Sequence, residues 1–271
     1  MRLFSRCLRS GFGFPHALLT MTNIKKDIIK IFDKLFKRFS YQGWWPVFNL
    51  KTNSSLYRKK KYLPDDGEIY EVCVGAILTQ NTSWKNVEKA IGNLKRESFM
   101  EPCKLLRTKD EILHCLIKSS GYYKQKTKKL KNFTLWFLNN RKDIKKYGLF
   151  EFRGKLLSIN GIGRETADSI LLYAFGFPIF VIDSYTKRLF NRFFNDNKEY
   201  DYDELRIIFE TSFKKDFKIF NEFHALIVKL SKDICLKNNP LCNLCPLCLK
   251  CKWSLYELSR WDRQTYLPRE N

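Results

Sequence analysis

The sequence predicts an all-α protein, and three observations favour that fold class. Apolar residues recur at the spacing of amphipathic helices through most of the chain. The apolar-polar alternation that is typical of β-strands is essentially absent. Hydrophobic residues make up 44% of the 271 positions, which is ample for the core of one large or two modest domains.

The helices are expected in the following order. A broad apolar stripe predicts the first helix over residues 25–39, and a polar, basic loop is expected over residues 51–61. The run EIYEVCVGAILTQNTSWKNVEKAIGNL predicts a buried helix, a short break at residues 80–83 and an amphipathic helix. Further helical patterns cover residues 109–118, 126–139, 152–159, 164–175, 184–194, 202–213 and 220–233.

The chain is strongly basic, with 50 lysines and arginines against 28 acidic residues, a surplus of 22 positive charges. Such a surplus is typical of proteins that bind a polyanion, so nucleic acid is the first partner to consider. A lysine-rich bias shared by an organism's proteins would give the same surplus without that partner. No stretch reaches the roughly 18 apolar residues of a membrane span, so we expect a cytoplasmic, nucleoid-associated protein.

The first 20 residues contain three arginines, no acidic residue and only a weak apolar run. This composition fits an organelle-targeting leader. It fits equally a start codon assigned too early, with translation beginning at Met21. Residues 1–20 therefore carry no part of the fold prediction.

Two segments carry candidate chemistry. Gly161 and Gly163 flank a single residue between two helical patterns, and such a turn can present backbone amides to a phosphate or simply join two helices. The apolar run at residues 179–182 leads to Asp183 at the start of a helix. An aspartate in this place is most often an N-cap, although it can also be a reactive carboxylate.

Together, the stretches LLSINGIGRETA and VIDSYTKRLFNR resemble the helix-hairpin-helix DNA glycosylase superfamily, which includes endonuclease III and the adenine glycosylases. The stretches ILTQNTSW and GYYKQKTKKL are similar to that family as well, and the resemblance covers about residues 44–251. It implies a DNA glycosylase with Asp183 as the essential aspartate and Gln80 filling the gap left by a flipped base. Residues implied to contact DNA are Gln80, Gly161, Gly163, Arg164 and Thr166.

The resemblance also implies two helical lobes with double-stranded DNA in the cleft between them. We expect residues 63–176 to form the central lobe, which contains the hairpin. Residues 21–62 and 177–271 are expected to form a second, discontinuous lobe, and the protein is expected to act as a monomer.

Five of the nine cysteines lie between Cys235 and Cys251, and such clustering favours a metal site over disulfides. Cys235, Cys242, Cys245 and Cys251 resemble the four-cysteine loop that holds a [4Fe–4S] cluster in many members of the superfamily. Zinc is the alternative occupant. Cys248 allows a second ligand set, from Cys242 to Cys251, in which Cys235 is spare.

Glu165 occupies the position at which bifunctional relatives of endonuclease III carry a lysine that attacks the sugar. A carboxylate cannot form a Schiff base, so the sequence predicts a monofunctional glycosylase without AP lyase activity. We expect Glu165 and Asp168, three residues apart in the first helical turn, simply to complement the helix dipole.

Trp44, Trp45 and Pro46 resemble the endonuclease III-related 3-methyladenine DNA glycosylase subgroup. An indole stacks on a flipped base and attracts a cationic one, so an alkylated purine is the expected substrate. The tryptophans would otherwise fill the core between the lobes. The rival functions are a glycosylase or AP lyase for oxidised or mismatched bases, and a non-catalytic DNA-binding protein.

Overall fold

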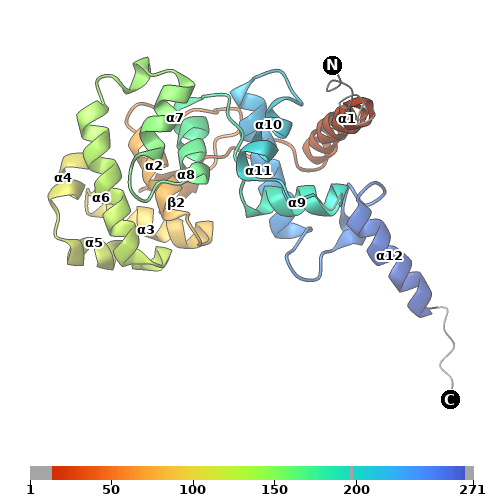
Figure 1. Ribbon diagram of the computed structural model, residues 1–271. Coiled ribbons are helices and arrows are strands. Elements are labelled where there is room, and N and C mark those ends of the chain that lie inside the picture. The colour runs from red at the N-terminus through yellow and green to blue at the C-terminus, as the bar shows by residue number, and fades with distance from the viewer. Residues whose placement is uncertain (1–13, 196–197, 266–271) are drawn as a thin grey trace, which may run out of the picture.

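The computed structural model describes residues 14–195 and 198–265. In these ranges the protein is mostly helical, as predicted (Figure 1). The elements of the first part are α1 (Phe14–Phe39), β1 (Val47–Asn49), β2 (Ser54–Leu56), α2 (Ile69–Leu78), α3 (Trp84–Arg96), α4 (Pro102–Arg107), α5 (Asp110–Ile117), η1 (Lys118–Ser120), α6 (Tyr123–Asn140) and η2 (Ile144–Lys146). The second part contains α7 (Leu149–Leu157), α8 (Arg164–Ser169), the π-helical turn η3 (Ile170–Ala174), α9 (Ser184–Phe194), α10 (Tyr202–Glu210), α11 (Phe217–Asp233), η4 (Cys242–Leu244) and α12 (Lys252–Thr265).

Figure 1 shows two groups of helices side by side. Helices α2–α8 form one group, while α9–α12 and α1 form the other. The first and last parts of the chain meet in the second group, because α1 packs against α10 and α11. None of the helices within the described ranges is both long and apolar enough to cross a membrane.

The N-terminal helix is longer than the sequence predicts. It begins at Phe14, inside the segment that the sequence analysis set aside, whereas residues 1–13 lie outside the described part of the chain. From Thr22 onward its apolar face is buried, with Ile28 and Leu35 fully enclosed and Ile31 3% exposed. This stripe at helical spacing is the reason that the segment is a helix and that it packs on α11.

The fold class holds, but the sequence analysis did not anticipate one small element: β1 and β2 form an antiparallel hairpin with Val47 opposite Leu56, and β2 lies within the loop expected over residues 51–61. Glu71 of α2 accepts a hydrogen bond from the Phe48 amide, and Trp84 of α3 donates one to Ser55. The hairpin therefore fixes the loop that precedes it, which carries Trp44 and Trp45, against the central helices.

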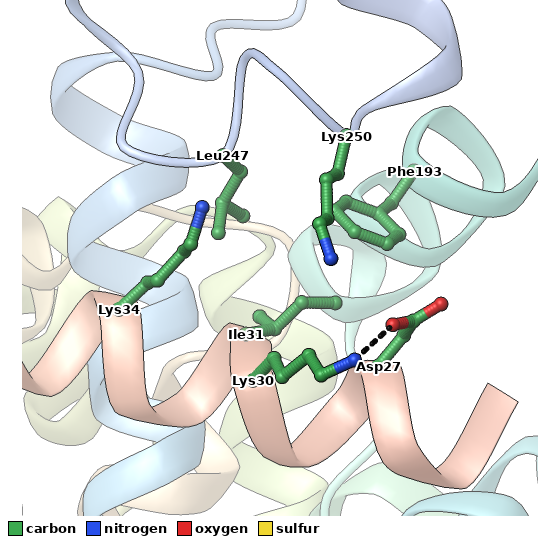
Figure 2. Close-up of a pocket in the computed structure, with 7 residues that line it drawn as sticks. All are labelled: Asp27, Lys30, Ile31, Lys34, Phe193, Leu247 and Lys250. Carbon is green, nitrogen blue, oxygen red and sulfur yellow. Dashed lines mark ion pairs between the residues drawn. The ribbon is translucent and has the colours of Figure 1, made fainter. Parts of the chain in front are cut away.

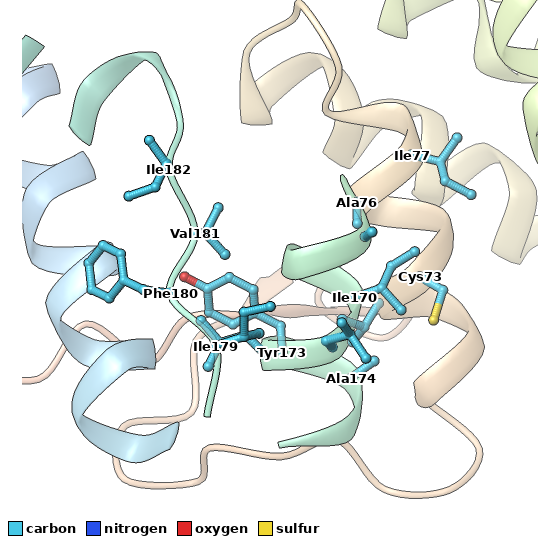
Figure 3. Close-up of a cluster of buried hydrophobic side chains, with 14 of the residues drawn as sticks. Cys73, Ala76, Ile77, Ile170, Tyr173, Ala174, Ile179, Phe180, Val181 and Ile182 are labelled. Carbon is cyan, nitrogen blue, oxygen red and sulfur yellow. The ribbon is translucent and has the colours of Figure 1, made fainter. Parts of the chain in front are cut away.

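The apolar run Ile179–Ile182 passes through the core between the two groups of helices (Figure 3). All four of its residues are at most 1% exposed. The run lies beside Tyr173 and Ala174 of η3 on one side, while the Phe180 ring points to the other side and packs on Phe209 of α10 and Phe220 of α11. Because the run is enclosed on all sides, the residue that follows it, Asp183, has a fixed position at the start of α9.

Candidate active site

A pocket of about 90 Å³ lies between the two groups of helices. The loop before β1, the end of α2, the start of α3, α8, the start of α9 and α11 all contribute to its walls. Its aromatic residues are Trp44, Trp45, Trp84 and Tyr185, and its polar residues include Gln80, Glu165, Thr166, Asp183, His224 and Lys232. The structure therefore brings together residues that are far apart in the sequence.

Asp183 is both an N-cap and a pocket residue, so the two interpretations of the sequence are compatible. Its Oδ1 accepts a hydrogen bond of 2.7 Å from the Thr186 amide, which caps α9. Its Oδ2 lies 3.4 Å from Nε2 of His224. Burial opposes ionisation of Asp183, but His224 and the Thr186 amide outweigh it and hold the pKa below its usual range. The carboxylate is therefore ionised at neutral pH.

The His224 ring connects this carboxylate to a buried tyrosine. Nδ1 of His224 and the Tyr173 hydroxyl are 2.6 Å apart, and both residues are buried, Tyr173 completely. Burial raises the pKa of Tyr173 well above its usual value, so the phenol keeps its proton. Neither residue could be identified from the sequence, because no local pattern links position 173 or 224 to Asp183.

Glu165 lies in the pocket wall, which corrects the expectation that it only complements a helix dipole. Burial of its carboxyl group, followed by repulsion from Asp183, raises the pKa of Glu165 to about 7. Glu165 as a whole residue is nevertheless exposed to solvent. Asp168 instead faces the interior, where Arg153 donates two hydrogen bonds to it, of 2.6 and 3.1 Å. These two acidic residues of α8 thus have separate surroundings.

The hairpin turn is held against the pocket by Gln80. Nε2 of Gln80 donates to the Gly161 carbonyl at 3.2 Å and to Oγ1 of Thr166 at 2.9 Å, while Lys129 donates to Oε1. Gly161 has φ +97°, and a Cβ there would lie 2.3 Å from Cγ of Lys129, so this position requires glycine. Gly163 is the N-cap of α8.

Arg164 follows directly, and it is exposed and forms an ion pair of 3.3 Å with Asp203. Of the hairpin residues predicted to contact DNA, Thr166 alone lines the pocket. Gly161, Gly163 and Arg164 lie on the turn beside it.

Three of the aromatic residues that line the pocket are tryptophans in contact with one another. The ring of Trp84, which the sequence analysis did not single out, lies 5.0 Å from Trp44 and 5.4 Å from Trp45 between centroids. Nε1 of Trp45 is buried and has no hydrogen-bond partner among the described residues. Lys232 places its ammonium 5.9 Å from the Trp44 ring, and burial lowers its pKa. Pro46 is buried but does not line the pocket, contrary to expectation.

The cysteine loop connects α11 to α12. Arg192 of α9 donates to Sγ of Cys235 at 3.3 Å, and Sγ of Cys251 donates to the Arg192 carbonyl at 3.4 Å. Burial, and then the neighbouring thiols of Cys235, Cys251 and Cys242, raise the pKa of Cys245 to about 12. In the described part of the chain, no three or more histidine, cysteine or acidic side chains, these cysteines included, are arranged to hold a metal ion. Four neighbouring cysteines whose thiolates would repel one another are nevertheless the donor chemistry that a bound metal cluster neutralises.

The same loop packs on the N-terminal helix (Figure 2). Leu247 of the loop meets Ile31 of α1, and the ammonium groups of Lys30, Lys34 and Lys250 surround this contact. The pocket there is small, and its acidic residue, Asp27, is paired with Lys30 at 3.5 Å. The lysines add positive charge to the face formed by α1 and the loop.

Comparisons with known proteins agree with this arrangement. Residues 74–215 match the model of the family described as HhH-GPD superfamily base excision DNA repair protein. A Methanocaldococcus jannaschii protein that carries the name of a DNA repair glycosylase is 44% identical over 225 residues, covering 81% of this chain and 93% of the relative. An endonuclease III–DNA complex has a TM-score of 0.68 at 18% identity, over 87% of this chain and 98% of the other.

The structure is also similar to that of the H. pylori 3-methyladenine DNA glycosylase bound to 1,N6-ethenoadenine. Its TM-score is 0.55 at 26% identity, and the match covers 78% of this chain and 97% of the other. The family match spans more than half of the chain, and it includes the hairpin and Asp183. The chain therefore belongs to the HhH-GPD superfamily of base excision DNA repair proteins and is a DNA glycosylase.

Proposed function

We propose that the protein is a monofunctional glycosylase that flips an alkylated purine, 3-methyladenine foremost, out of double-stranded DNA and hydrolyses its N-glycosidic bond. The observation that carries the proposal is the composition of one pocket. The pocket brings together three tryptophans and an ionised Asp183, and position 165 carries a glutamate in place of a lysine. The likeness to the H. pylori 3-methyladenine glycosylase supports the same substrate class.

In this proposal the two groups of helices are the lobes at residues 63–176 and at residues 21–62 with 177–271, and a single copy of the chain holds DNA between them. Gly161, Gly163, Arg164 and Thr166 contact the DNA backbone without reading its sequence. Gln80 leaves its hydrogen bonds to the hairpin and fills the space of the flipped base.

Hydrolysis of the N-glycosidic bond passes through a sugar that carries positive charge. An ionised Asp183 close to C1′ stabilises that charge and orients the attacking water. A methylated purine that already bears a positive charge leaves without a general acid. The indoles favour such a cationic base.

The main rival is a glycosylase with AP lyase activity, and one observation favours it. Although Glu165 cannot attack the sugar, Lys232 places an amine in the pocket. Borohydride reduction during turnover distinguishes the two functions, since it traps a Schiff base covalently. We expect no trapped protein–DNA product, whereas a product lost in Lys232→Met would show that Lys232 supplies lyase chemistry.

The first test of the proposed function is to identify the free base that the protein releases. With methylated genomic DNA, we expect 3-methyladenine to be released well before any normal base. Duplexes with a single oxidised base or a mismatch serve as matched controls. Preferential release from those controls would contradict the alkylpurine assignment while leaving glycosylase activity intact.

We further propose that Cys235, Cys242, Cys245 and Cys251 hold a [4Fe–4S] cluster, with zinc as the alternative. The cluster would fix the loop on α1 and α9, because Arg192 contacts both Cys235 and Cys251. Such a cluster supplies structural order here.

Metal analysis tests this ligand set. We expect about four iron and four sulfide per chain in the purified protein. Cys251→Ser should lose most of the iron and lower the thermal midpoint, whereas Cys248→Ser should keep both. Loss of iron in Cys248→Ser but not in Cys235→Ser would favour the second ligand set. One zinc per chain without sulfide would show that the site holds zinc and not an iron–sulfur cluster.

A further inference from the structure

A chain of three polar groups leads from the core to the pocket: Tyr173, His224 and Asp183, of which the proposed reaction uses only Asp183. The Tyr173 hydroxyl lies 2.6 Å from Nδ1 of His224, and Nε2 of the same ring lies 3.4 Å from Oδ2 of Asp183. The three residues come from η3, from α11 and from the start of α9. No two of them are neighbours in the sequence, so the contact exists only in the folded protein.

Tyr173 and Asp183 together determine which nitrogen of the histidine carries the proton. A protonated phenol can donate to Nδ1 or accept from it, but the Asp183 carboxylate beside Nε2 favours a proton on that nitrogen, so the Tyr173 hydroxyl donates to Nδ1. A neutral imidazole whose Nδ1 accepts a hydrogen bond carries its own proton on Nε2. That nitrogen is buried and has no hydrogen-bond partner among the described residues. The acceptor that faces it is Asp183.

A buried donor without a partner is costly, so the interaction with Asp183 should tighten when DNA closes the pocket. Oδ1 of Asp183 is already fixed by the Thr186 amide. A second donor at Oδ2 would fix the plane of the carboxylate and favour its ionised form.

We propose that His224 is a positioning residue for the glycosylase reaction: with its tautomer set by Tyr173 and Asp183, it donates from Nε2 to Asp183 and keeps that carboxylate ionised and aimed at the sugar. No proton leaves the histidine in this role. The effect on the rate of base release rests on the proposed function. The tautomer itself is a property of the free protein.

Other charged and titratable groups surround the pair. Glu165 of α8 interacts electrostatically with both Asp183 and His224. Tyr185 of α9 and Lys232 of α11 lie close enough to Asp183 to be influenced by its charge. These groups stay in place in variants of positions 173 and 224, so changes between variants report the histidine.

NMR of the ring nitrogens tests the tautomer without any activity measurement. The chain has only three histidines, so ¹⁵N-histidine labelling gives few signals to assign. We expect His224 at neutral pH to carry its proton on Nε2 and to have an unprotonated Nδ1. In Tyr173→Phe this preference should weaken or reverse. A proton on Nδ1, or on both nitrogens, in the unaltered protein would overturn the proposal.

The pH dependence of base release tests the consequence. We expect the acidic limb of the single-turnover rate on methylated DNA to move up by about one pH unit in His224→Phe. His224→Gln, whose amide can donate in place of Nε2, should recover most of the shift. His114→Phe is the matched control, because that ring contacts Tyr123 of α6 edge to face, outside the pocket.

The outcomes separate this inference from the proposed function. An acidic limb that is unmoved in both His224 variants would reject the positioning role. A limb that moves equally in His224→Gln and His224→Phe would also reject it, since packing alone would then explain the shift. If the unaltered protein released no base at all, the proposed function would fail, while the NMR result would still decide the tautomer.

Discussion

Replacement of Asp183 by asparagine is expected to reduce base release from methylated DNA by about a thousandfold or more while DNA binding is retained. The amide has nearly the same shape, and its oxygen can still accept the hydrogen bond from the Thr186 amide that caps α9. It has no negative charge with which to stabilise the sugar cation. Single-turnover release measures the loss, and fluorescence anisotropy with lesion DNA measures binding.

The matched control for this substitution is Asp233→Asn. Asp233 is 44% exposed, lies near the end of α11 and pairs with Lys229, so the same chemical change there should affect release very little. A denaturation curve for each variant checks that the cap survives. Full activity in Asp183→Asn would remove the residue from the mechanism.

Replacement of Asp168 by alanine is expected to produce the largest loss of stability, about 3–5 kcal/mol in the free energy of unfolding. The Asp168 side chain is completely buried and accepts two hydrogen bonds from Arg153, which is 15% exposed. Its removal leaves the guanidinium with only the more exposed Asp203 as an acidic partner. Urea denaturation measures the loss.

A surface pair provides the comparison for that prediction. Asp66 is 83% exposed and pairs with Lys145, so Asp66→Ala should cost less than about 1 kcal/mol. If Asp168→Ala cost no more than Asp66→Ala, the buried pair would contribute nothing special to the fold.

Much of the helical architecture could be predicted because most helices carry their own local signals. The segment 184–194 was predicted with the bounds that α9 has, since Asp183 provides a cap and the apolar residues keep helical spacing. The two strands were missed because each has only three residues, too few for alternation to be visible. Helix α4 is only six residues long, and its start depends on Glu101 and Pro102, which also went unnoticed.

The candidate site was predictable where the residues belong to a recognisable motif. Trp44, Trp45, Gln80 and Asp183 were all named from the sequence, and the structure places them in one pocket. His224 was not, because it lies on a helix whose pattern only shows a buried face, 41 positions from Asp183. Trp84 had a visible signal, since it ends the stretch ILTQNTSW that resembles the family, but nothing local directed it toward Trp44 and Trp45.

The packing of α1 on α11 has a consequence for how the protein is made. Gln42, just after α1, is bonded to Glu222 of α11 across 180 residues of sequence. At ordinary translation rates the ribosome needs roughly 10–40 s to cover that distance. During this interval the apolar face of α1 has no native partner. Asp183 and the tryptophans do not yet line a common pocket. A nascent chain thus cannot act on a genome until its synthesis is almost finished.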